Sequence, residues 1–150
     1  MEVTIRPARA DDIPGICDLL TELFSIEADF TADREKQALG VGCMIDDRSG
    51  HTLLLVAESG SAVVGMATCQ TLISTAEGGR VGLVEDVVVA REFRGQGIGS
   101  RLLEHVMQWA QERKLKRIQL LADKDNLPAL NFYAGLGWEK TSLICLRKML

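Results

Sequence analysis

A strand-like run leads into a basic, glycine-rich loop in the stretch Val87-Val88-Val89-Ala90-Arg91-Glu92-Phe93-Arg94-Gly95-Gln96-Gly97-Ile98-Gly99-Ser100. The β-branched residues predict a strand, and apolar residues at helical spacing from Ile98 to Ala110 predict a long amphipathic helix after the loop. A helix that begins in such a loop presents unpaired N–H groups and the positive end of its dipole. Glycines let the backbone approach a ligand closely, and Arg94 adds positive charge. The stretch therefore predicts an anion cradle, most naturally for a pyrophosphate.

Two common nucleotide-binding loops do not fit this stretch. A Walker loop ends in Gly-Lys-Ser/Thr, whereas Gly99 is followed here by Ser100 and Arg101. A dinucleotide-binding loop needs a third glycine at a longer spacing, where the same Ser100 and Arg101 stand. A plain turn before a helix is the simplest alternative, but three glycines weaken a helix start and need a reason.

The rest of the chain alternates between strand and helix patterns. Period-two and β-branched runs predict strands, and apolar spacings of three and four predict helices. The expected order is strand 3–5, helix 13–24, loop 27–32, helix 33–45, strands 53–58, 62–71 and 81–90, helix 98–110, strand 117–122, helix 126–136 and strand 138–147. This order predicts an α/β fold with a mixed, mostly antiparallel central sheet, flanking helices and a late β-α-β crossover.

Length and composition set broad bounds. With 150 residues, 47% of them hydrophobic and 25% charged, the chain is expected to form one domain over residues 1–150. A net charge of −4 disfavours a nucleic-acid partner, and no apolar run reaches the roughly 18 residues of a membrane span. The four cysteines form no close pair, which predicts reduced, mostly buried thiols in a cytoplasmic protein.

Two motifs at the expected separation resemble the GNAT family of N-acetyltransferases. Arg94-x-x-Gly97-x-Gly99 after a valine-rich strand is similar to the family's acyl-CoA pyrophosphate loop. Asn126-x-x-Ala129-x-x-Phe132-Tyr133-x-x-x-Gly137-Trp138 resembles its second motif, with Trp138 where phenylalanine is commoner. The order of elements agrees over nearly the whole chain. The resemblance implies the acyl-CoA N-acyltransferase fold and transfer of an acetyl group from acetyl-CoA to a primary amine.

The resemblance also implies which residues bind acetyl-CoA, the expected co-substrate. The family's sheet splays beside the strand that ends near Ala90, and the backbone of that strand pairs with the pantetheine arm and polarises the thioester carbonyl. The side chains of this strand can still belong to the core. Asn126 matches a position that contacts the pantetheine or acyl end, and it equally suits a helix N-cap. The implied cofactor-binding set is Val87, Val88, Val89, Arg94, Gly95, Gln96, Gly97, Ile98, Gly99, Ser100, Asn126 and Tyr133.

Two residues are expected to carry the proton transfers. Tyr133, the only tyrosine, matches the family's general acid, which protonates the leaving thiolate; the alternative is a ring packed in the core. Glu85 matches a carboxylate that deprotonates the amine; the alternative is a rim charge paired with an arginine, with substrate bound as the free amine. Strand alternation puts Glu85 and Asp86 on opposite faces. A covalent route through Cys69 or Cys145 lacks a visible histidine partner, and no metal is implied.

The acceptor is expected to be a primary amine of a small molecule or a protein. In the family, substrate contacts come from segments that correspond to residues 21–46 and 71–80. The acidic residues there either attract a cationic substrate or form a solvated rim; they are Glu22, Glu27, Asp29 and Asp33. Dimers are common in the family, which leaves a homodimer open. The alternative function is a non-catalytic acyl-CoA-binding regulatory module, against which the presence of Tyr133 and Glu85 argues.

Overall fold

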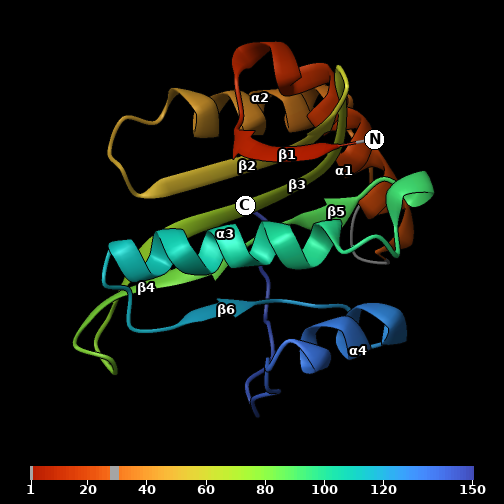
Figure 1. Ribbon diagram of the computed structural model, residues 1–150. Helices are drawn as coiled ribbons and strands as arrows, with labels where there is room; N and C mark the ends of the chain where they lie inside the picture. Colours follow the sequence, from red (N-terminus) through yellow and green to blue (C-terminus); the bar gives the residue numbers. More distant parts are fainter. Residues whose placement is uncertain (1, 28–30) are drawn as a thin grey trace. The chain divides into compact units, whose positions relative to one another are not determined.

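The computed structural model describes residues 2–27 and 31–150, in two compact units that divide between Leu120 and Leu121. The first unit carries every strand in the described part of the chain (Figure 1). The elements, in order, are β1 (Val3–Pro7), η1 (Ala10–Asp12), α1 (Ile13–Ile26), α2 (Arg34–Asp46), β2 (Thr52–Ser59), β3 (Ala62–Ser74), β4 (Gly79–Val84), β5 (Val87–Val89), η2 (Arg91–Phe93), α3 (Ile98–Glu112), β6 (Ile118–Leu120) and α4 (Leu127–Gly135).

The described strands form one mixed sheet of six in the order β1-β2-β3-β4-β6, with β5 paired to β3. Every pair is antiparallel except β4 with β6, which is parallel and is reached by the crossover through α3. The predicted fold class, a mostly antiparallel sheet with a late β-α-β crossover, is therefore confirmed. No helix among the described residues is both long and apolar enough to cross a membrane.

The two faces of the sheet are covered by different helices. Met66 and Val88 pack in a buried cluster with Ile16 of α1 and with residues of α2. On the other face, a Cβ added to Gly65 would lie 3.2 Å from Leu102 Cδ1 of α3, so a glycine lets this helix pack closely on the sheet. From Gly65 to Gln70, alternation along β3 therefore sends even-numbered side chains toward α1 and α2, and odd-numbered ones toward α3. The register shift opposite Ala57 and Glu58 breaks this alternation, so Val63 packs against Gly15 of α1.

The predicted strand 81–90 is wrong as one element, because it is broken into β4 and β5. Between the pairs Gln70–Leu83 and Ala67–Val87, two residues of β3 face three residues of the other chain segment, which is a β-bulge. At the bulge the Asp86 N–H donates to Thr68 Oγ1 at 3.0 Å, and the Thr68 N–H donates to the Asp86 carbonyl at 3.0 Å. The side chain of Thr68 thus replaces a backbone acceptor that the bulge displaces.

The predictions for the last quarter of the chain need two corrections. The predicted strand 138–147 is wrong, since residues 139–147 are exposed and form no strand. A strand needs a neighbour to satisfy its backbone groups, and the unit that begins at Leu121 contains no other strand among its residues. The predicted strand 117–122 is shorter, at Ile118–Leu120. The helix predicted at 126–136 is confirmed as α4, with ends one residue inside the prediction.

A buried ion pair fixes the corner between β1 and α1. Both terminal nitrogens of Arg6 donate to Asp12, at 2.8 and 2.9 Å, and its Nε donates to Glu58 of β2 at 2.9 Å. The Arg9 N–H adds a bond of 2.7 Å to the same aspartate. These hydrogen bonds, those from Arg6 first, hold the pKa of Asp12 below its usual range although the side chain is buried.

Candidate functional site

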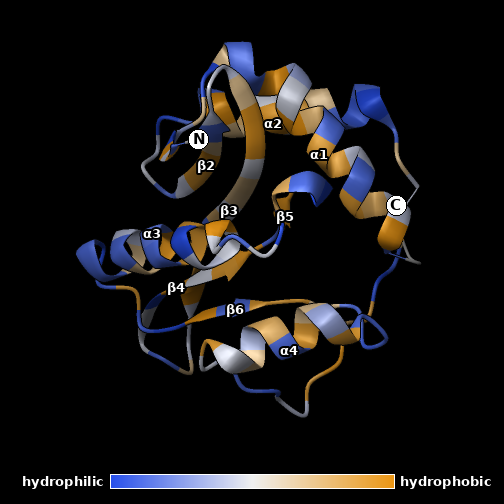
Figure 2. Cartoon of the chain, turned by 45° about the vertical axis from the view of Figure 1, so that its right-hand side comes forward, coloured by the Kyte–Doolittle hydropathy of each residue, from blue (hydrophilic) through white to orange (hydrophobic). Residues whose placement is uncertain are grey.

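The loop before α3 has the backbone conformation that only glycine adopts easily. Gly95 and Gly97 have φ values of +76° and +79°, and a Cβ added at either position would meet no atom within 4 Å. The glycines are therefore required by the left-handed backbone rather than by crowding. Figure 2 shows the change from the hydrophobic β5 to the hydrophilic η2 just before this loop. The loop presents an open, polar surface.

The first turn of α3 has backbone N–H groups that no acceptor within the helix satisfies. Gly97 is the N-cap of the helix and no side chain caps it. The first helical bond runs from the Arg101 N–H to the Gly97 carbonyl at 3.1 Å, so the N–H groups of residues 98–100 have no acceptor inside the helix. An anion at this terminus would satisfy these donors and meet the positive end of the helix dipole.

Arg94 is already engaged by two partners. Its Nε donates to the Val89 carbonyl at 2.9 Å, and its Nη2 lies 3.3 Å from Glu22 Oε1 of α1. Both side chains of this ion pair are partly exposed, so the contact is weak and exchangeable. Any anion that recruits Arg94 has to compete with these two contacts.

One edge of β5 is left without a strand partner. The Ala90 N–H bonds the Val64 carbonyl at 2.8 Å, and the Asp86 carbonyl accepts from Thr68, so residues 86, 88 and 90 bond to β3. In an antiparallel pair the alternate residues turn their backbone groups outward. The N–H groups of Val87 and Val89 therefore point away from β3, on a side where no described strand pairs with β5. β6 pairs with β4 alone, as expected for a sheet that splays here.

Two adjacent carboxylates lie between β4 and β5. Glu85, the predicted general base, is exposed. Asp86 is half-buried and lies opposite Thr68, on the face covered by α1 and α2. Burial first, and then the charges of Glu85 and Glu27, raise the pKa of Asp86 to about 7. Sequence reasoning missed Asp86 as a site residue, although the alternation had already placed it on the opposite face from Glu85.

The second unit holds the other two predicted site residues. The Asn126 side chain accepts from the Ala129 N–H at 3.3 Å, so its interpretation as a helix N-cap is confirmed. The ring of Tyr133 is half-buried and packs edge-on against Phe132 and Trp138, with centroids 5.3 and 5.8 Å apart. These contacts belong within the second unit, and the action of Tyr133 on a ligand of the first unit stays a prediction.

The expectations for cysteines and acidic residues are met in part. Cys17 and Cys69 are buried, whereas Cys43 and Cys145 are exposed, so the prediction of mostly buried thiols holds for two of the four. Of the four acidic residues in the substrate segment, Glu22 pairs with Arg94 and Asp33 caps α2. Asp29 lies outside the described residues.

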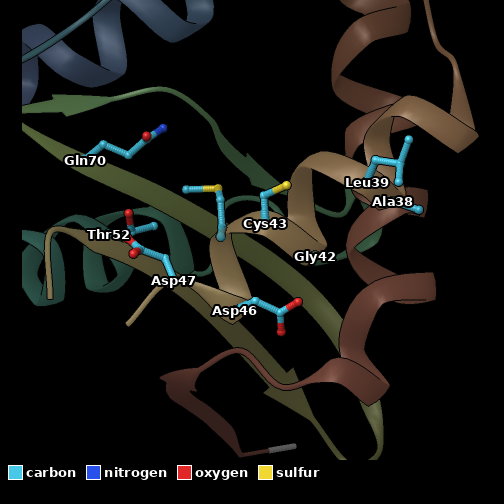
Figure 3. A pocket seen from close by; sticks show the side chains of 9 residues that line it. Ala38, Leu39, Gly42, Cys43, Asp46, Asp47, Thr52 and Gln70 are labelled. Carbon is cyan, nitrogen blue, oxygen red and sulfur yellow. The ribbon is translucent and has the colours of Figure 1, made fainter. Parts of the chain in front are cut away.

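The structure contains a hollow that the sequence did not indicate. It has a volume of about 660 Å³ and lies beside α2, at Thr52 of β2 and Gln70 of β3 (Figure 3). Its lining consists of Ala38, Leu39, Gly42, Cys43, Met44, Asp46, Asp47, Thr52 and Gln70, and we call it the α2 hollow. It shares no residue with the glycine loop.

Comparison with known proteins gives consistent results. Residues 13–138 match the model of the acetyltransferase (GNAT) family. An uncharacterized N-acetyltransferase of Archaeoglobus fulgidus is 31% identical over 134 residues, which cover 87% of this chain and 89% of that protein. A thialysine N-epsilon-acetyltransferase of Bos taurus is 30% identical, over 90% of this chain and 83% of its own length. The crystal structure of a transcriptional regulator from Bacillus halodurans is 28% identical, with a TM-score of 0.83 over 99% of this chain and 100% of that one.

Proposed function

The chain belongs to the acetyltransferase (GNAT) family and is an acyltransferase that uses an acyl-CoA, and on this premise we propose that it moves an acetyl group from acetyl-CoA to a primary amine. The amine attacks the thioester directly while both substrates are bound. We further propose that one domain over residues 1–150 performs this reaction in the cytoplasm, which agrees with four free cysteines.

The observation that carries the proposal is that two sets of unpaired backbone N–H groups follow one another along the chain, at the open edge of β5 and at the start of α3. Coenzyme A has an arm with two amide groups followed by a pyrophosphate. The outward N–H groups of Val87 and Val89 suit the amides and the thioester carbonyl, and the free donors of residues 98–100 suit the pyrophosphate. We propose Val87–Val89 and Arg94–Ser100 as the cofactor-binding segments, with Asn126 and Tyr133 added from the second unit.

Two groups complete the proposed chemistry. A phenol with a pKa of about 10 is protonated at neutral pH, so Tyr133 can give its proton to the departing thiolate. A carboxylate at the β4–β5 bulge takes the proton of the attacking amine. Glu85 is the residue predicted for this step from the sequence, and Asp86 is its neighbour on the opposite face.

We propose that the acceptor is a small molecule rather than a protein. The Bos taurus relative is named a thialysine N-epsilon-acetyltransferase, and the acceptor in that name is a small molecule.

The direct test is a thermal melt with acetyl-CoA, free coenzyme A and ATP. A ligand at about 100 times its Kd adds roughly 2.7 kcal/mol of stability, which raises the Tm of a domain of this size by about 5–10 °C. We expect this shift with both coenzyme A species and none with ATP. Absence of a shift with either coenzyme A species would refute the proposed cofactor.

A matched pair of variants locates the cradle. Gly97→Asp puts a negative charge at the start of α3 and should weaken acetyl-CoA binding at least about tenfold. Gly78→Asp carries the same strain, since its φ is +70° and a Cβ there also meets nothing, but it lies in the β3–β4 turn. Equal binding losses in both variants would contradict a cradle at Gly97.

A further inference from the structure

Thr68 lies where the partner of β3 changes from β4 to β5. These two strands follow one another along the same side of β3 (Figure 1). The register between β3 and β4 ends at the pair Gln70–Leu83, and the register between β3 and β5 begins at the pair Ala67–Val87. Thr68 therefore stands beside the extra residue of the β4–β5 bulge.

Two hydrogen bonds join Thr68 to Asp86 across this bulge. The Thr68 N–H donates to the Asp86 carbonyl at 3.0 Å, and the Asp86 N–H donates to Thr68 Oγ1 at 3.0 Å. In a regular antiparallel pair the second acceptor is the backbone carbonyl of the residue opposite. Here the hydroxyl oxygen of Thr68 takes the part of that carbonyl.

The neighbours of Thr68 on β3 cannot replace its hydroxyl. Thr68 carries the only side-chain oxygen among residues 66–69, because the others are Met66, Ala67 and Cys69. Thr68 is also 1% exposed, so its hydroxyl is shielded from water. An N–H that loses its acceptor in such surroundings destabilises the local structure. The Thr68 hydroxyl is therefore the group that holds the Asp86 N–H in the bulge.

The bulge decides which N–H groups of β5 are free. Residues 86, 88 and 90 bond to β3, and the N–H groups of Val87 and Val89 point outward. Without the extra residue, the β3–β4 register would continue into β5, shifted by one residue from the observed pairing. Hydrogen bonding alternates along a strand, so this shift would exchange the two sets. Val87 and Val89 would then bond to β3, and the N–H group of Val88 would face the open edge.

We propose that Thr68 is a positioning residue for the acetyl transfer: its hydroxyl stabilises the bulge, and the bulge sets the register that turns the N–H groups of Val87 and Val89 toward the cofactor. This inference rests on the proposed function, in which these N–H groups bind the arm and the thioester carbonyl of acetyl-CoA. Thr68 acts through the backbone of Asp86 and not by contact with either substrate.

Apolar packing should keep the chain folded when the hydroxyl is removed. Val88 is 5% exposed and packs in the same buried cluster as Met66 and Ile16 of α1. A shift by one residue would turn Val88 to the other face of the sheet, which this packing opposes. Loss of the hydroxyl is therefore expected to loosen the pairing of β5 with β3 rather than to unfold the domain.

The experiment removes the hydroxyl while it keeps the shape of the side chain. Thr68→Val replaces the hydroxyl with a methyl group, whereas Thr68→Ser keeps the hydroxyl and removes the methyl group. Val106→Ala is the control for a loss of stability alone, because Val106 is buried on α3 and distant in sequence from the bulge. The full chain and the three variants are compared by Tm, by isothermal titration with acetyl-CoA and by amide hydrogen exchange.

Hydrogen exchange reports the register directly. In the unchanged chain, acetyl-CoA should slow the exchange of the Val87 and Val89 N–H groups, because they gain acceptors on the cofactor. The Asp86 N–H should exchange about tenfold faster or more in Thr68→Val, and acetyl-CoA should protect Val87 and Val89 less in this variant. Thr68→Ser and Val106→Ala should both keep the pattern of the unchanged chain.

The affinity for acetyl-CoA should follow the hydroxyl and not the stability. We expect Thr68→Val to raise the Kd about tenfold or more, and Thr68→Ser to raise it less than about threefold. Val106→Ala should lower the Tm and leave the Kd within about twofold of that of the unchanged chain. A role of Thr68 in stability alone would not separate the serine variant from the valine variant in this way.

The remaining outcomes separate the two proposals. An unchanged Kd in Thr68→Val, or equal increases of Kd in Thr68→Ser and Thr68→Val, would overturn the role of Thr68 while acetyl transfer stands. Absence of acetyl-CoA binding by the unchanged chain would overturn the proposed function. Hydrogen exchange of the Asp86 N–H without any ligand would then still decide whether the Thr68 hydroxyl holds the bulge.

Discussion

Asp12 and Asp86 are two carboxylates withdrawn from water whose pKa values move in opposite directions. Asp12, at the corner of β1 and α1, receives two hydrogen bonds from Arg6 and one from a backbone N–H. Asp86, at the β4–β5 bulge, receives none from the described residues and faces two other carboxylates. The pKa of Asp12 is lowered and that of Asp86 is raised to about 7.

The difference separates an acid that stabilises the fold from one whose raised pKa makes it a candidate for proton transfer. The charge on Asp12 is stabilised by its partners and ties two elements together, so its ionisation favours the folded state. The charge on Asp86 has no such partner among the residues that the structure describes, so its ionisation opposes folding. Groups of the second kind gather at functional sites, because a pKa near the working pH is what proton transfer requires.

The largest expected effect comes from removing the partner of Asp12. Arg6→Ala leaves a buried carboxylate unpaired and should lower the free energy of unfolding by about 3–5 kcal/mol. Arg34→Ala, which breaks the exposed pair with Asp18, should change it by less than about 1 kcal/mol. Urea unfolding at pH 7 measures both. Similar losses of unfolding free energy in the two variants would mean that the buried Asp12 pair stabilises the fold no more than the exposed Asp18 pair.

At the β4–β5 bulge, removing the charge of the carboxylate is expected to stabilise the fold. The pKa of Asp86 rises from 3.8 to about 7 on folding, so the folded state holds the proton more tightly and stability falls as pH rises from about 4 to 7. Asp86→Asn should therefore raise the free energy of unfolding by about 2–4 kcal/mol at pH 8 and by almost nothing at pH 4. Glu104→Gln controls for the loss of one surface charge. A destabilised Asp86→Asn at pH 8 would show that Asp86 has a stabilising partner.

The charged neighbours of Asp86 should shift its pKa by smaller amounts. Glu85→Gln and Glu27→Gln each remove a negative charge and should lower the pKa of Asp86, Glu85→Gln more than Glu27→Gln. Titration of the Asp86 carboxyl carbon by NMR measures the two shifts. An upward shift in either variant would contradict the origin assigned to the raised pKa.

Glu22 is an intermediate case, since it pairs with Arg94, which we also propose as a contact of the cofactor. Glu22→Gln removes one of the two contacts that hold Arg94 and should tighten acetyl-CoA binding by less than about fivefold. Isothermal titration at two salt concentrations checks this, because an ion pair this exposed weakens at high salt. Weaker binding in this variant would mean that Glu22 positions Arg94 for the cofactor.

Local patterns explain which predictions succeeded. The glycines at 95 and 97 and the valines at 87–89 predicted a strand, loop and helix from backbone preferences of a few neighbouring residues. The segment 138–147 has the same kind of β pattern but forms no strand, because strand formation depends on a partner that no local pattern specifies.

The features of the candidate site also fall into those that local sequence patterns predict and those that depend on the folded chain. The sequence by itself predicted the order of strands and helices, the glycine loop before α3 and the family, because each shows in patterns of residues close together in the chain. Only the tertiary structure decided that β3 meets a bulge at Thr68, that Asp86 rather than Glu85 is withdrawn from water there, and that α2, Thr52 and Gln70 line an open hollow. A pKa and a cavity are set by burial and by charges from distant segments, and these exist only once the chain has folded.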